Sequence, residues 1–128
     1  MQIVPEGPTY EVAHLGRPTE AIGIIGPGLG LVPYLDVVAT IDNESKSAAL
    51  FILNRDLEKP REVEISWRDI VPSKINTCQT MTGNDLKAVN TFERPTNVVP
   101  QNLESPRLGP KMTLQVPARS YSVVSLAI

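Results

Sequence analysis

One stretch of the chain carries side chains of the types that catalysis uses most often. In residues 88–100, AVNTFERPTNVVP, a carboxylate, Glu93, lies between the aromatic Phe92 and the guanidinium of Arg94. A carboxyl that an aromatic ring and Pro95 shield from water is a candidate general acid, because desolvation raises its pKa. The adjacent Arg94 favours the ionised form instead. We therefore interpret Glu93 as a loop residue in a local ion pair or bonded to neighbouring turns.

The other carboxylates occupy positions that are typical of solvent-exposed residues. The chain has 14 Asp and Glu residues, and those in its centre lie in turns or on the polar side of an alternating run. Exposed carboxylates keep nearly normal pKa values and are poor general acids. The polar turn at 42–46, DNESK, lacks the glycine and the terminal glutamate of a calcium loop. The sequence thus predicts no catalytic residue and no metal site.

The remaining reactive side chains and the glycines offer no cofactor chemistry. Cys78 and His14 are each the only residue of their type, so we expect both to have packing or surface roles. The glycines of residues 21–33, AIGIIGPGLGLVP, do not have the spacing of a nucleotide-binding loop. This stretch is predicted to be an irregular connector, and no cofactor is expected.

Aromatic side chains could bind sugar rings by stacking on their apolar faces. The chain has six aromatic residues, and the pattern places Phe51, Trp67 and Tyr121 on apolar faces of strands. Tyr34 and Trp67 are weak candidates for carbohydrate binding. They are too few for a convincing stacking platform.

Size and charge limit the kinds of partner. A chain of 128 residues can bury one hydrophobic core, and its net charge of −2 gives no reason to expect nucleic acid or an anionic membrane as a partner. The longest apolar runs are far shorter than the roughly 20 residues that cross a bilayer. The first residues, MQIVPEGPTYEV, lack the features of a signal peptide, so a cytoplasmic location is favoured as an expectation.

The pattern changes at residue 34. Before it, Pro8 and Gly16 bracket a short predicted helix at 8–15, and the Gly/Pro connector follows. After it, alternating or apolar runs predict strands at 34–41, 48–54, 61–68, 111–117 and 120–128. Residues 74–89 predict two further strands around a turn at 83–85. The prediction is a short helix and a connector at 1–33, followed by an all-β, jelly-roll-like antiparallel β-sandwich at 34–128.

Within this fold, residues 88–100 are predicted to form a stiff loop. We expect Phe92 to be an anchor that packs over the edge of the sandwich. Asn90 and Asn97 are expected to bond backbone groups of the loop, as asparagine does in turns. Pro95 and Pro100 would stiffen the excursion.

Five motifs in order give the chain a family resemblance. They are PTYEV at 8–12, VPYLDVVATID at 32–42, LFILNRD at 50–56, MTGNDLKAVNTFERPTNVVP at 81–100 and VPARSYSVVSLAI at 116–128. Together they resemble the C-terminal part of a family 51 glycoside hydrolase, an α-L-arabinofuranosidase. The most specific elements are the structural signature residues Asn54, Arg55, Asn90, Phe92, Glu93 and Pro95.

The resemblance implies a larger enzyme. Such enzymes have a catalytic (β/α)8 barrel followed by a jelly-roll-like sandwich, and the segment 8–15 would match the last barrel helix. Their two catalytic glutamates, a retaining pair expected about 5–5.5 Å apart, would lie upstream of residue 1. The parent enzyme would remove terminal α-L-arabinofuranosyl residues from arabinan or arabinoxylan. The expected partners of this chain are the barrel and other subunits of a homo-oligomer.

A second hypothesis comes from a different class of protein. The chain could be a free-standing β-sandwich that binds carbohydrate or another partner. An affinity for arabinan or arabinoxylan that Tyr34→Ala or Trp67→Ala abolishes would favour this alternative.

Overall fold

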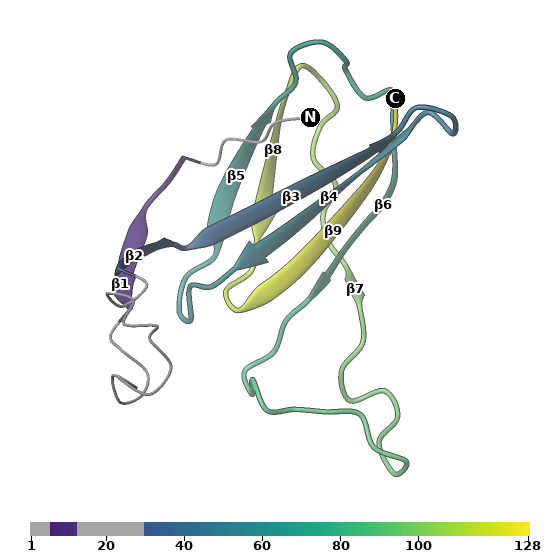
Figure 1. Ribbon diagram of the computed structural model, residues 1–128. Coiled ribbons are helices and arrows are strands. Elements are labelled where there is room, and N and C mark those ends of the chain that lie inside the picture. Colours follow the sequence, from purple (N-terminus) through teal and green to yellow (C-terminus); the bar gives the residue numbers. More distant parts are fainter. Residues whose placement is uncertain (1–5, 13–29) are drawn as a thin grey trace, which may run out of the picture.

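The computed structural model describes residues 6–12 and 30–128, and every regular element in them is a strand (Figure 1). These strands are β1 Thr9–Val12, β2 Gly30–Pro33, β3 Leu35–Asp42, β4 Ser47–Asn54, β5 Arg61–Ser66, β6 Lys74–Met81, β7 Gln101–Asn102, β8 Lys111–Val116 and β9 Ser120–Ala127.

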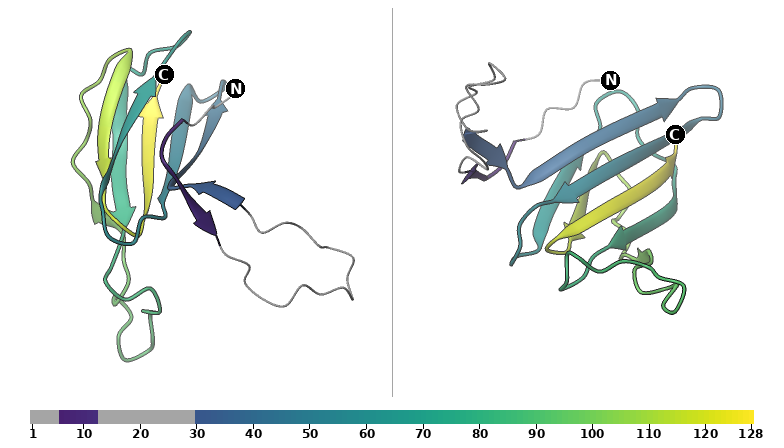
Figure 2. Two further views of the ribbon diagram at one scale, coloured as in Figure 1. Left: turned by 90° about the vertical axis from the view of Figure 1, so that its left-hand side faces the viewer. Right: turned by 60° about the horizontal axis from the view of Figure 1, so that its bottom comes forward.

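The strands form three antiparallel sheets. The largest has the order β3-β4-β9-β6-β7, a second pairs β5 with β8, and a third pairs β1 with β2. Figure 2 shows the β5-β8 pair and the five-stranded sheet as separate layers, from which the β1-β2 pair projects. Hydrogen bonds from Tyr34 N to Pro8 O and from Arg55 N to Tyr34 O connect β1 and the end of β4 to the backbone between β2 and β3.

The core lies between the five-stranded sheet and the β5-β8 pair. Burial alternates along β4 and β9, as expected when one face of a strand packs and the other does not. β5 and β8 contribute their own alternate positions to the same cluster. The buried hydrophobic residues are Ala48, Leu50, Ile52, Val63, Cys78, Met112, Leu114, Val116, Val124 and Leu126.

These observations confirm the predicted all-β, jelly-roll-like sandwich. The strands predicted at 34–41, 48–54, 61–68, 111–117 and 120–128 correspond to β3, β4, β5, β8 and β9. β4 differs in one respect, because its apolar sequence predicted burial on both faces. Only the face toward β5 and β8 is fully buried, and the other is partly exposed.

The predicted helix at 8–15 is wrong in the part that the structure describes. Thr9–Val12 is strand β1, paired in register with Gly30–Pro33. Residues 13–15, and the connector up to residue 29, lie outside the described residues. β-Branched and aromatic residues such as Thr9 and Tyr10 favour strands, but the pairing itself depends on a segment about twenty residues away.

The second strand predicted within residues 74–89 is also wrong. β6 ends at Met81, and residues 82–100 contain no strand before the two-residue β7 pairs back onto β6. We call residues 82–100 the finger loop, because they extend away from the sandwich at the bottom of Figure 1. Side chains of the loop, rather than a neighbouring strand, form hydrogen bonds with its backbone groups.

Candidate docking surface

The described carboxylates include exposed groups and members of ion pairs and turn hydrogen bonds. Glu93 is exposed in the finger loop, and Glu64 forms an exposed ion pair of 3.2 Å with Lys111. Hydrogen bonds lower the pKa of Asp42 and of Asp56, which is the opposite of what a general acid needs. Three ion pairs are found among the described residues, and none of them includes Glu93.

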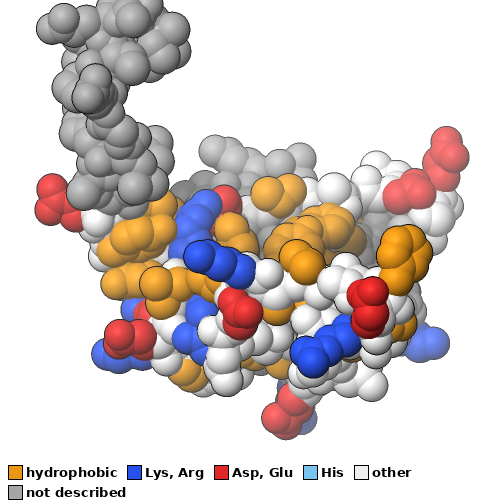
Figure 3. Space-filling view, turned by 90° about the horizontal axis from the view of Figure 1, so that it is seen from below, with side chains coloured by type: hydrophobic (Ala, Val, Ile, Leu, Met, Phe, Trp, Pro, Cys, Tyr) orange, Lys and Arg blue, Asp and Glu red, His pale blue; other side chains and the backbone are white. Residues whose placement is uncertain are grey.

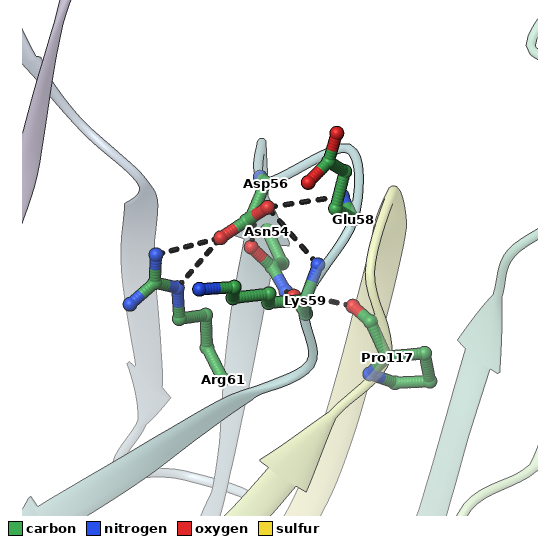
Figure 4. A network of polar contacts seen from close by, with 6 residues as sticks. All are labelled: Asn54, Asp56, Glu58, Lys59, Arg61 and Pro117. Carbon is green, nitrogen blue, oxygen red and sulfur yellow. Dashed lines mark hydrogen bonds and ion pairs between the residues drawn. The ribbon is translucent and has the colours of Figure 1, made fainter.

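Asn54 and Asp56 organise a buried corner where β4 leaves the sheet (Figure 4). The Asn54 Nδ2 group donates to Pro117 O at 2.8 Å and to Lys59 O at 3.2 Å, while its Oδ1 accepts from Asp56 N at 3.0 Å. Asn54 therefore joins the β4–β5 and β8–β9 connections. This role is structural and agrees with its place in the motif LFILNRD.

Asp56 closes the same loop through its carboxylate. One oxygen accepts from Glu58 N and Lys59 N, both at 3.0 Å, and the other accepts two bonds from Arg61. The bond from Glu58 N is the largest cause of the lowered pKa of Asp56. Desolvation raises this pKa, and the bonds from Lys59 N and Arg61 lower it further.

Asp56 is expected to make the stability of the domain fall in acid. Because the folded-state pKa lies below the ordinary value of 3.8, the ionised group stabilises the fold above that value. This contribution is lost as the pH falls through the lowered folded-state pKa. We expect the urea midpoint to fall less steeply below pH 4 in Asp56→Asn than in the unmodified chain, when both are measured from pH 7 to pH 3.

Asp42 provides the control for this pH experiment. Its pKa is lowered chiefly by the Ser45 hydroxyl, and then by the Glu44 and Ser45 amides, in the turn after β3. Asp42→Asn should therefore remove a separate part of the acid sensitivity. If the urea midpoint falls equally steeply with decreasing pH in Asp56→Asn and in the unmodified chain, the role assigned to Asp56 is contradicted.

Arg55, the signature residue that follows Asn54, forms bonds to β2 and β3. Its guanidinium donates to Pro33 O at 3.0 Å and forms an ion pair of 2.7 Å with Asp36. These contacts fasten the end of β4 to the start of β3. Arg55 is partly exposed, and its contacts are with protein groups.

The two weak carbohydrate candidates, Tyr34 and Trp67, have different neighbours. Trp67 is partly buried against the core, and its indole Nε1 donates to the sulfur of Met112 at 3.3 Å. Tyr34 is also partly buried, with the Tyr10 ring centroid at 4.8 Å and the Arg61 guanidinium 4.4 Å from its own ring centroid. Both rings are already engaged by protein groups.

The prediction that Phe92 packs over the sandwich edge is wrong. Its side chain is fully exposed, with a relative exposure of 103%. The loop keeps its shape without it, because Asn90 bonds both backbone groups of Val98 and Asn97 Nδ2 donates to Val89 O at 3.1 Å. These bonds confirm the predicted roles of Asn90 and Asn97.

Phe92→Ala is therefore expected to leave the stability of the isolated chain unchanged. An exposed ring loses no packing when it is removed, whereas a buried ring would cost roughly 3 kcal/mol. Urea unfolding monitored by circular dichroism measures the difference. A clear drop in the midpoint would show that the ring packs against the sandwich after all.

The five-stranded sheet has a second apolar surface on the side away from β5 and β8. We call this the outer face. Its side chains lie across neighbouring strands, and the Phe51 and Tyr121 rings stack with centroids 6.5 Å apart. An open hollow beside it reaches Pro100 at the base of the finger loop. The large apolar residues of the outer face are Val38, Phe51, Leu53, Met81, Tyr121 and Val123.

Cys78 is a free and buried cysteine. Burial raises the pKa of the Cys78 thiol, so it is less reactive than a free cysteine. Residues 6–12 and 30–128 contain no group of three or more His, Cys, Asp or Glu side chains placed to hold a metal. In the same ranges, no helix is long and apolar enough to cross a membrane.

The fold therefore defines an antiparallel β-sandwich domain, and comparison with known proteins identifies its family. The model of the alpha-L-arabinofuranosidase C-terminal domain matches residues 2–120, and the chain belongs to this family. No curated protein sequence matches the chain.

Solved structures agree with this assignment. The family 51 α-L-arabinofuranosidase from Bifidobacterium longum is 27% identical, with a TM-score of 0.73 over 94% of this chain and 21% of that chain. The enzyme from Thermotoga petrophila is also 27% identical, with a TM-score of 0.64 over 75% of this chain and 20% of that one. The arabinofuranosidase from Xanthomonas axonopodis pv. citri, at 18% identity and a TM-score of 0.68 over 93% and 21%, shares the fold. The chain thus spans about one fifth of the length of these structures.

Proposed function

We propose that this chain is an accessory domain that packs against the catalytic domain of an α-L-arabinofuranosidase and contributes no catalytic residue. The observation that carries the proposal is the family match over residues 2–120 in a chain that spans about one fifth of its structural relatives. The parent reaction would be the retaining removal of terminal α-L-arabinofuranosyl residues by a carboxylate pair on the catalytic barrel.

The arrangement of polar groups supports a structural role. The buried Asn54 side chain joins the β4–β5 and β8–β9 connections, and the buried Asp56 carboxylate bonds the backbone of its own loop and Arg61. The division into a barrel-derived segment at 1–33 and a sandwich at 34–128 is part of the same proposal, as is contact with further subunits of an oligomer.

Incubating the 128-residue chain with an aryl α-L-arabinofuranoside tests its lack of catalysis. We expect no turnover above a buffer blank, and sustained turnover would overturn the proposal. Sequencing the reading frame around the chain tests the second part. We expect the frame to continue upstream into a catalytic barrel, and a stop codon there would favour a barrel on a separate polypeptide or a free-standing module.

A further inference from the structure

The finger loop exposes an unusual amount of apolar surface for a segment without regular structure. Phe92 is fully exposed, and Leu86 and Val89 are 68% and 63% exposed. Val99, closer to the base of the loop, is also exposed. Single exposed apolar residues are normal, but several in one short segment indicate a surface that contacts something else. Figure 3, viewed from the end where the loop emerges, shows hydrophobic side chains gathered in clusters between charged ones.

The loop holds these side chains in a fixed arrangement. Asn90 Oδ1 accepts from Val98 N at 2.6 Å, and Asn90 Nδ2 donates to Val98 O at 2.9 Å, so the two arms of the tip are clamped together. Within the tip, Thr91 bonds Arg94 twice, through Thr91 Oγ1 and through its backbone amide. A contact element that is already ordered loses less conformational entropy on binding.

The base of the loop is tied to the sandwich by the β8–β9 turn. Arg119, which has a φ of 50°, donates from its guanidinium to Gly83 O, to Asn84 Oδ1 and to Leu57 O. Thr82 Oγ1 donates to Ala118 O at 2.8 Å. These bonds set the direction in which the finger loop leaves the sandwich.

We propose that the finger loop is a docking element whose exposed apolar side chains, Leu86, Val89 and Phe92, pack against the catalytic domain that accompanies this domain. The inference rests on the proposed function and adds the surface through which this domain contacts the catalytic domain. The match covers 21% of the Bifidobacterium longum chain, so about four fifths of that protein lies outside the matched domain and is a candidate to contact it. The exposed apolar residues of this loop are mostly aliphatic and include a single ring, which suits a protein surface better than a sugar ring, because sugar rings stack on flat aromatic faces.

A thiol in place of Phe92 tests the proposal. We would prepare Phe92→Cys and, as a matched control, Val71→Cys, both in the 128-residue chain and in the protein that contains the catalytic domain. Val71 is also exposed but lies in the β5–β6 connection, at the opposite end of the sandwich in Figure 1. Iodoacetamide alkylation of each peptide is followed by mass spectrometry, with the buried Cys78 as the slow internal reference.

We expect both thiols to react rapidly in the 128-residue chain. In the protein with its catalytic domain, Cys at position 92 should react at least about tenfold more slowly, because packing excludes the reagent, while Cys at position 71 is unchanged. Equal reactivity of position 92 in both proteins would overturn the docking proposal and leave the proposed function intact. If no catalytic domain accompanies the chain, both proposals fail.

Two further outcomes of the same experiment would assign the loop to another occupant and overturn the proposal. Protection of position 92 that rises with the concentration of the 128-residue chain would indicate a second copy. Protection by arabino-oligosaccharides in the 128-residue chain would indicate a sugar site. Unchanged thermal unfolding of Phe92→Cys verifies that the variant is folded.

Discussion

Replacing Ile52 with alanine is expected to lower the free energy of unfolding by about 3–4 kcal/mol, as measured by urea unfolding, because a buried isoleucine leaves a cavity that the core fills only in part. Ile52 has no exposed surface and lies in β4. β4 pairs with β3 on one side and with β9 on the other, so the surrounding backbone has little freedom to collapse into the space.

Val38 provides the matched control on the opposite side of the same sheet. It lies in β3, faces away from β5 and β8, and is 56% exposed. Val38→Ala should cost less than about 1 kcal/mol, as surface substitutions usually do. Similar losses for the two variants would contradict the placement of the core between the five-stranded sheet and the β5-β8 pair.

The parts of the fold that sequence reasoning predicted correctly are those that local alternation determines. From Val63 in β5 and throughout β8, apolar and polar side chains alternate, and the buried positions Val63, Met112 and Leu114 follow that pattern. β4 is apolar throughout, so its sequence could not show which face is covered. That depends on the β5-β8 layer, which meets only one side of the sheet.

The predictions that failed depended on distant partners. Thr9–Val12 becomes a strand by pairing with Gly30–Pro33, and the sequence of residues 8–16 alone does not indicate that partner. Phe92 was expected to pack over the edge of the sandwich. The finger loop instead closes on itself through Asn90 and Asn97, and the ring is left outside.

For the signature residues Asn54 and Arg55, sequence reasoning was partly successful. Its motif identified the family, but the sequence did not reveal what the side chains do. Asn54 bonds Pro117, which is 63 residues away, and Arg55 bonds Pro33 and Asp36. Such roles become visible only when the topology brings the ends of β4, β8 and β2 together.

Asn54→Ala is expected to lower the free energy of unfolding by about 3 kcal/mol. The side chain is 1% exposed and makes three hydrogen bonds, so its removal leaves Asp56 N and Lys59 O without these partners, while Pro117 O keeps its bond from the Ser120 hydroxyl. Leaving buried polar groups unsatisfied costs more than the net value of the bonds themselves. Urea unfolding of this variant beside Asn102→Ala, an exposed asparagine in β7, measures the difference.

Asn54→Asp separates the loss of hydrogen bonds from the loss of volume. The carboxylate has the same shape and still accepts from Asp56 N, but it places negative charge against the carbonyl oxygens of Lys59 and Pro117. We expect this variant to be at least as unstable as Asn54→Ala at pH 7, since an unpaired buried charge is costly. Its deficit relative to the unmodified chain should shrink as the pH falls, because the protonated carboxyl can donate one bond. A variant as stable as the unmodified chain at pH 7 would mean that the two carbonyls do not need the Asn54 donor.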